Sequence, residues 1–407
     1  MKGKKRLAVF ALLTFVAMTG AVPRLFHGAA AAQGANGLEV PVFEPDPAFP
    51  RLPNNWVLGN VAGVAIDRHD HVWMIHRPRT VPADKAPAPP VLEFDAAGKF
   101  LQAWGGDGPG FDWPDAEHNI FVDHRDNVWI SGSSPGGQSK TTRSDDMLLK
   151  FTSTGKFLLQ VGGRSVSLGS KDPKSVNKPG DLFVSARTNE VYLADGYGNR
   201  RVIVLDADTG AFRRMWGAFG NLPEDDAGSG GRGASGGPLG GRGATPAAAE
   251  ADGPGPPRFA SPVHGIVVSD DNIVYVADRS NRRMQMFTPE GKYLGQMFVN
   301  RAGPEGSVSG FALSPDKDQR YLYMADFGNS HIVVADRRKL EILYQFGKRG
   351  TGPGEFQGLH HIAADSKSNL YAAEVAPGAR IQRFVFRGLS STLPPNALTP
   401  DQLSARR

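Results

Sequence analysis

The chain contains no cysteine, which excludes disulfide bonds, thiolate metal ligands and a cysteine nucleophile. A fold without disulfides must be stabilised by burial of apolar surface, which a chain of 407 residues can supply. After residue 32 the sequence has no long segment with helical periodicity and no apolar run long enough to span a membrane. The lack of helical periodicity favours an all-β protein.

The start of the chain has the order of residues that is typical of a secretory signal peptide. Four basic residues within positions 2–6 precede an uncharged apolar stretch at 7–22, and alanines at 30–32 offer a cleavage site before Gln33. We therefore expect residues 1–32 to be removed and the protein to be secreted or periplasmic. An uncleaved membrane anchor is the alternative interpretation.

The positive charge of the chain belongs to this leader. The whole sequence has a formal net charge of +5, and residues 1–32 hold five basic residues and no acidic one. The remaining chain is formally neutral, so its charge does not indicate a nucleic-acid partner and we expect none.

A short phrase occurs six times along the chain. It begins with His or a small residue, followed at two and four residues by apolar residues and at five by Asp or Ser. Around each copy, short runs rich in Val, Ile, Tyr and Phe alternate with Gly, Asn, Asp and Pro, which predicts four strands per unit of roughly 45–60 residues. The copies begin at Ala62, His118, Gly180, His264, Ser309 and His360.

Six four-stranded units predict a six-bladed β-propeller over residues 33–390, acting as a monomer. A solenoid is the alternative, but it would need capping units. The last unit shows three strands, and we expect a strand near residues 56–58 to complete it and close the ring. Residues 221–257, rich in Gly, Ala and Pro, predict a flexible loop between blades three and four, and 391–407 form a C-terminal tail.

The histidines of the phrase point to a metal site. His118, His264 and His360 begin every second copy, so a closed ring would place three imidazoles at one level, about 120° apart. Three imidazoles with an open fourth position are typical of a catalytic zinc site. Zn²⁺ is our first choice, and Fe, Mn or Cu stay open. A ring of hydrogen-bonded histidines without metal is the alternative.

Two further motifs resemble known families. Residues 195–200 and 278–282 resemble the Asp-Asn-Arg signature of NHL repeats, in which Asp and Asn stabilise turns. Residues 61–67, 72–77 and 195–199 resemble segments of the peptidyl-α-hydroxyglycine α-amidating lyases, which are six-bladed propellers, and this resemblance covers residues 61–386.

The resemblance to these lyases implies roles for particular residues. His118, His264 and His360 would bind Zn²⁺, Tyr197 would accept a proton, and Arg77 would pair with a carboxylate or developing negative charge. The substrate would be a C-terminal α-hydroxyglycine, cleaved at its N–Cα bond to an amide and glyoxylate. The family places a calcium-binding Asp after its third zinc histidine; His361 stands there in this chain, which argues against structural calcium.

Two other interpretations of the sequence remain open. A non-catalytic NHL-type scaffold in the cell envelope would bind a peptide, glycan or protein across one face, and a hydrolase or lactonase would use the same ring. For an enzyme we expect a small molecule or a peptide as the substrate.

Overall fold

The computed structural model describes residues 39–134, 141–225, 253–301 and 306–399. They all fall in one unit, Glu39–Arg407, and contain 24 β-strands and two short 3₁₀ helices, η1 (Pro78–Thr80) and η2 (Ala218–Gly220). Within these ranges no helix has the length and hydrophobicity needed to cross a membrane. The predicted leader lies outside the described residues, and so does most of the predicted loop at 221–257.

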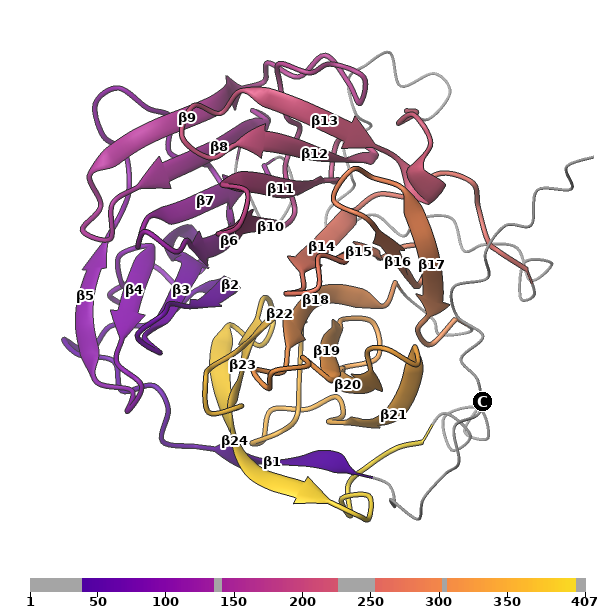
Figure 1. Ribbon diagram of the computed structural model, residues 1–407. Helices are drawn as coiled ribbons and strands as arrows, with labels where there is room; N and C mark the ends of the chain where they lie inside the picture. Colours follow the sequence, from indigo (N-terminus) through magenta and orange to yellow (C-terminus); the bar gives the residue numbers. More distant parts are fainter. Residues whose placement is uncertain (1–38, 135–140, 226–252, 302–305, 400–407) are drawn as a thin grey trace, which may run out of the picture. The chain divides into compact units, whose positions relative to one another are not determined.

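The strands form six antiparallel sheets of four strands each, the six blades of a β-propeller (Figure 1). Blades one to three are β2 (Asn60–Ile66), β3 (Val72–Arg77), β4 (Val91–Phe94) and β5 (Phe100–Trp104); β6 (Glu117–Val122), β7 (Val128–Gly132), β8 (Asp145–Phe151) and β9 (Phe157–Arg164); and β10 (Leu182–Ser185), β11 (Glu190–Asp195), β12 (Arg201–Asp206) and β13 (Phe212–Trp216). Blades four and five are β14 (Val263–Val268), β15 (Val274–Asp278), β16 (Arg283–Phe287) and β17 (Tyr293–Phe298); and β18 (Val308–Leu313), β19 (Tyr321–Asp326), β20 (His331–Asp336) and β21 (Glu341–Phe346). Blade six contains β22 (Leu359–Ala364), β23 (Leu370–Glu374), β24 (Arg380–Ser390) and β1 (Val40–Asp46).

The ring is closed by contacts between the first strands of neighbouring blades. β2 contacts β6 and β22, and the same kind of contact continues through β10, β14 and β18. An N-terminal strand completes the sixth blade, as the sequence predicts, but the predicted segment was wrong. The strand is β1, which pairs with β24, whereas Val57 makes only an isolated bridge to Pro87.

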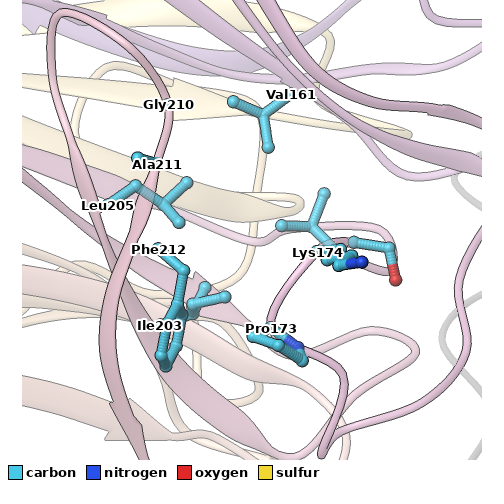
Figure 2. A pocket seen from close by; sticks show the side chains of 10 residues that line it. Val161, Pro173, Lys174, Ile203, Leu205, Gly210, Ala211 and Phe212 are labelled. Atoms are coloured by element: carbon cyan, nitrogen blue, oxygen red, sulfur yellow. The ribbon is translucent and has the colours of Figure 1, made fainter.

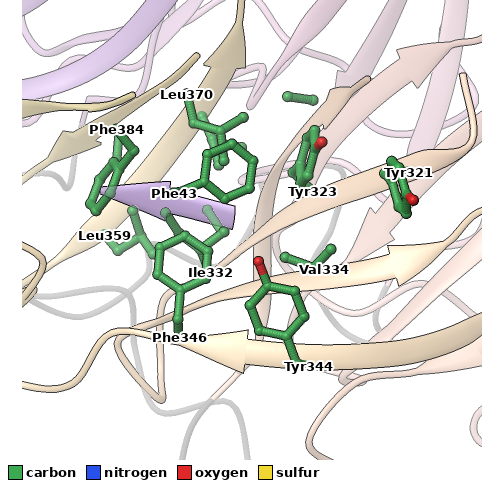
Figure 3. Packing of buried hydrophobic residues seen from close by; sticks show 14 of the residues in the cluster. Phe43, Tyr321, Tyr323, Ile332, Val334, Tyr344, Phe346, Leu359, Leu370 and Phe384 are labelled. Atoms are coloured by element: carbon green, nitrogen blue, oxygen red, sulfur yellow. The ribbon is translucent and has the colours of Figure 1, made fainter. Parts of the chain in front are cut away.

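The hydrophobic core consists of six clusters, each lying between two adjacent blades. Figure 3 shows the cluster between blades five and six, where Phe43 of β1 packs edge-on against Tyr323 and stacks on Phe346 at a centroid distance of 5.8 Å. Removing β1 would therefore expose both aromatic side chains, so this strand closes the core as well as the sheet.

The Asp that ends the repeated phrase stabilises the turn between the first two strands of a blade. In blade two, the Asp123 carboxylate accepts the backbone N–H groups of Arg125 and Asn127 and the indole N–H of Trp129. Asp67 in blade one and Asp365 in blade six accept equivalent bonds. The phrase therefore places its first residue at one end of the innermost strand and a turn-stabilising side chain at the other.

Candidate metal centre

The three histidines of the phrase lie at irregularities in the innermost strands. The pairing of the first two strands shifts register around His118, around His264 and around His360. A β-bulge re-aims the side chain of the extra residue relative to the regular pleat. In these three blades it directs an imidazole towards the other two.

The structure brings the three imidazoles together in a buried cluster. The ring centroids of His118 and His264 are 5.1 Å apart, those of His118 and His360 are 4.8 Å apart, and those of His264 and His360 are 4.7 Å apart. All three side chains are buried, and their ring nitrogens could hold one metal ion.

Each imidazole is oriented by a hydrogen bond from its Nδ1–H to a backbone carbonyl of the next blade. This fixes the tautomer and leaves a lone pair on each Nε2, an arrangement that metal-binding histidines commonly use. The acceptors are the odd copies of the phrase: Gly180 O for His118 (2.7 Å), Ser309 O for His264 and Ala62 O for His360 (2.7 Å).

The three imidazoles of the cluster are uncharged. Burial lowers the pKa of all three histidines well below the ordinary value; Arg279 lowers it further for each, and Arg77 does so for His118 and His360. The rings are therefore neutral, and Nε2 of His264 lies 3.1 Å from Nε2 of His360. Lone pairs that converge in this way repel one another unless a positive ion lies between them, so the donor set fits a metal.

Tyr197 lies against the same cluster. Its hydroxyl is 3.1 Å from Nε2 of His118 and 3.0 Å from Nε2 of His264. Burial raises the pKa of Tyr197, while the charges of Arg279 and Arg77 and a hydrogen bond from Arg279 lower it. Positive charge near the Tyr197 hydroxyl thus favours its phenolate form, against the effect of burial.

The glycines on either side of Tyr197 allow this approach. A Cβ atom on Gly196 would lie 2.0 Å from the carbonyl oxygen of Val263, and one on Gly198 would lie 1.9 Å from Oδ1 of Asn177. Both contacts are far below van der Waals distance, so only glycine fits at these positions. The Asp-Gly-Tyr-Gly-Asn segment is therefore shaped to bring the phenol to the axis.

Arg77, at the end of β3, is also placed near the cluster. Its Nε donates to the carbonyl of Glu117 at 2.7 Å and one terminal nitrogen lies 3.4 Å from Oγ of Ser133. The guanidinium is buried, which lowers its pKa, while Tyr197 and Glu117 counteract this shift. The structure thus brings all five predicted site residues into one region.

Arg279 is a residue of this region that sequence reasoning missed. It acts on the pKa of Tyr197 and of each of the three histidines, and its guanidinium stacks 4.0 Å from the ring centroid of Phe327. Arg77 and Arg279 occupy the same position of the repeat. Val61 and Val263 each precede a copy of the phrase, and they pair with His76 and Asp278, the residues directly before the two arginines. This equivalence to Arg77 is the signal that could have identified Arg279. Two guanidinium groups therefore lie near the histidine cluster.

His361 lies one residue after the third histidine, where the resembled family has a calcium-binding Asp. Its Nδ1 is 3.1 Å from the carbonyl oxygen of Val64, and its Nε2 is 3.4 Å from Oδ1 of Asp181. An imidazole supplies no oxygen ligand, whereas Ca²⁺ prefers oxygen ligands. This geometry gives no support to a calcium site there.

An apolar hollow of about 370 Å³ lies between blades two and three, lined by residues of β9, β12 and β13 and the segment at 173–176 (Figure 2). Lys174 is the one titratable group among its lining residues. The chemistry therefore concentrates at the histidine cluster rather than in this hollow.

Comparisons with known proteins agree with this fold. No protein-family model matches the chain. NHL repeat-containing protein 3 of Homo sapiens is 26% identical over 305 residues, 73% of each chain. The probable peptidyl-alpha-hydroxyglycine alpha-amidating lyase pgal-1 of Caenorhabditis elegans is 23% identical over 364 residues, 83% of this chain and 86% of that one. A solved structure from Bacteroides thetaiotaomicron, described as a protein of unknown function, gives a TM-score of 0.50 at 13% identity and covers 81% of this chain and 70% of that one, a likeness of fold alone. The chain is a six-bladed β-propeller whose homologues include peptidyl-α-hydroxyglycine α-amidating lyases and NHL repeat proteins.

Proposed function

We propose that the protein is an exported, metal-dependent lyase that cleaves the N–Cα bond of an α-hydroxyglycine-type substrate to give an amide and glyoxylate. The observation that carries the proposal is the convergence of three neutral imidazoles and the Tyr197 hydroxyl at one place, with Arg77 and Arg279 nearby. The homology to amidating lyases supports the same reaction class.

His118, His264 and His360 would hold the metal through Nε2, with Zn²⁺ as the first choice for three imidazole ligands. A divalent cation held there supplies a Lewis acid for a substrate oxygen and a positive charge that favours the phenolate of Tyr197. The fixed Nδ1–H bonds keep the three rings from turning away.

The residues of the chain account for the remaining requirements of the reaction. Tyr197 accepts the proton of the substrate hydroxyl, the C–O bond becomes a carbonyl, and the N–Cα bond breaks with its electron pair moving to nitrogen. The nitrogen then takes up a proton to give the amide. Arg77 and Arg279 pair with the carboxylate that becomes that of glyoxylate, since a guanidinium binds a carboxylate through two parallel bonds.

The decisive experiment is release of glyoxylate from α-hydroxyhippurate by the metal-loaded protein. His264→Ala should abolish turnover and metal binding at the histidine cluster, whereas His124→Ala, which removes a histidine outside the cluster, should change neither. A parent protein that binds metal at the cluster but releases no glyoxylate from this substrate or from an α-hydroxyglycine peptide would refute the lyase activity.

Export is part of the proposal and has its own test. Mass spectrometry of the mature protein should find its N-terminus near Gln33, because the basic start and apolar stretch precede an alanine-rich cleavage site. Recovery of the intact chain from the cytoplasm would contradict it.

A second candidate function is a non-catalytic NHL-type scaffold that binds a peptide, glycan or protein. The observation in its favour is the match to NHL repeat-containing protein 3, at 26% identity over 73% of the chain. After dialysis against Zn²⁺, equal metal contents for the parent and for His264→Ala would favour the scaffold over the enzyme, because they would show that the histidine cluster holds no ion.

A further inference from the structure

A second group of possible metal ligands lies in blade one, at the turn between β2 and β3. Nδ1 of His71 is 2.7 Å from Oε1 of Glu93 and 3.6 Å from Oδ2 of Asp67, and one ligand atom from each residue lies within 4.8 Å of the others. The ring of His69 is 5.8 Å from that of His71. Imidazole and carboxylate groups thus meet around one point.

The same turn in other blades has a different chemistry. In blade two, Asn127 stands in place of His71 and its amide donates to Asp123; the residue across from Trp129 is Lys150. Trp73, the counterpart of Trp129, lies across from Glu93 instead. Blade one has therefore replaced an amide and a cation by an imidazole and a carboxylate.

Blade six follows blade two rather than blade one. Asn369 donates to Asp365, and the residue across from Tyr371 is Arg383. A positive side chain next to the turn is thus present in blades two and six, and a negative one in blade one. Asp67 belongs to the framework of the repeat, whereas His71 and Glu93 are the residues by which blade one departs from it.

Because blade one has Glu93 where the other two blades have a cation, two buried carboxylates share one imidazole. The side chains of Asp67 and Glu93 are 5% and 9% exposed, and among the described residues the ion pairs of both are with His71 alone. Even a protonated His71 would leave one net negative charge on this group. Buried carboxylates require a compensating charge, because their transfer from water is costly.

We propose that this cluster is a second divalent-metal site, with Nδ1 of His71, Oδ2 of Asp67 and Oε1 of Glu93 as protein ligands. One nitrogen and two carboxylate oxygens suit Zn²⁺, Mn²⁺ or Co²⁺, with solvent or His69 completing the shell. The side chain of His71 is 31% exposed, so an ion can reach the site.

The carboxylates are already oriented by other groups. Trp73 donates its indole N–H to Oδ2 of Asp67 at 3.0 Å, and Gln102 donates to Oε2 of Glu93. Such outer contacts position metal ligands in known sites. The 2.7 Å between His71 and Glu93 is shorter than the roughly 3.3 Å between ligands in a tetrahedral site with bonds near 2.0 Å, so the ion would replace their shared proton and separate them slightly.

This site is separate from the histidine cluster at the axis. Ala62, whose carbonyl accepts from His360, lies in β2, and Asp67 follows the end of that strand five residues later, which corresponds to about 16 Å of extended chain. The turn also contacts both neighbouring blades, through Arg68 with Asp126 and through Asp70 with Ser366. A metal here would stabilise blade one, which contacts blade six across the closure of the ring, independently of the proposed reaction.

The test is calorimetric titration of the chelator-treated full-length protein with Zn²⁺ alone. The parent should bind two ions, His71→Ala one, and the matched blade-two variant Asn127→Ala two. His264→Ala should lose the other site and keep this one. If the axial cluster binds no metal, the parent should bind one ion and His71→Ala none, so failure of the proposed function is distinguishable.

Glu93→Gln provides a second variant if His71→Ala does not fold. It keeps the shape and one hydrogen-bonding oxygen while removing a charge, and should weaken the blade-one site by at least about tenfold, as loss of even an outer contact does. Zn²⁺ should also raise the melting temperature of His264→Ala but not that of His264→Ala combined with Glu93→Gln. An unchanged ion count in His71→Ala together with an unchanged affinity in Glu93→Gln would overturn the proposal and leave a hydrogen-bonded His–Glu pair.

Discussion

The buried ion pair next to the Tyr197 segment allows a quantitative prediction about stability. The side chains of Arg201 and Asp195 are 0% exposed, and Nε of Arg201 donates to Oδ2 of Asp195 at 2.8 Å. The remaining guanidinium N–H groups donate to the carbonyls of Ser170, Asp172 and Ser175. One side chain thus satisfies a carboxylate and three backbone carbonyls.

Arg201→Met should lower the free energy of unfolding by about 3–5 kcal/mol, the usual cost of removing one partner from a buried pair. The variant leaves the buried Asp195 side chain with only neutral donors, the backbone N–H of Asn177 and the amide of Asn199. The matched control is Arg213→Met in the same blade, whose pair with Asp206 is on the surface, with 52% of Arg213 exposed. That change should cost about 0–1 kcal/mol.

Urea unfolding followed by circular dichroism checks the prediction, because a change in midpoint at constant slope reports stability alone. With a typical total stability of about 5–15 kcal/mol, Arg201→Met should remain folded but with a clearly lower midpoint. Equal midpoints for Arg201→Met and Arg213→Met would refute the argument, since they would show that burial of this pair does not determine its importance.

Three further predictions concern the site and its surroundings. Tyr197→Phe should lower kcat by about 10²–10⁴-fold, as expected for loss of an acid–base group, with the metal content by mass spectrometry unchanged. Arg77→Lys should lower kcat/KM at least about tenfold, because an ammonium cannot reproduce the planar fork, with circular dichroism as the check on folding. Burial raises the pKa of Asp326 to about 6, so the protonated form favours the folded state and this contribution is lost as the pH rises through about 6. Asp326→Asn should therefore gain up to ~3 kcal/mol relative to the parent between about pH 4 and pH 8, measured by urea unfolding at both values.

The blades could be predicted from sequence because their signals are local. The repeated phrase combines strand alternation with an Asp that stabilises the next turn, and both lie within six residues. The closing strand could not be placed in the same way. β1 contains Pro41 and Pro45, and two prolines argue against a strand in a sequence-based prediction. β1 is the outermost strand of its blade, however, where proline is tolerated.

The candidate site was predictable only in part. The phase of the repeat selects His118, His264 and His360, while Tyr197 and Arg77 came from the family resemblance. Arg279 lies within a motif interpreted as turn-stabilising, so its contribution needed the structure. The contact between His71 and Glu93 depends on the register in which β3 pairs with β4. The connection between these strands is long, so its length does not predict that register.

The alternation of His with small residues follows from how the blades pack at the axis. Each imidazole needs a carbonyl acceptor from the next blade, and that blade must bring its backbone close. A Cβ atom on Gly180 would lie 2.6 Å from the carbonyl oxygen of His264, so an imidazole at that position would displace the backbone of the strand that carries His264. A sixfold ring therefore places three imidazoles at its centre, and three imidazole ligands would leave the open coordination position that the proposed chemistry requires.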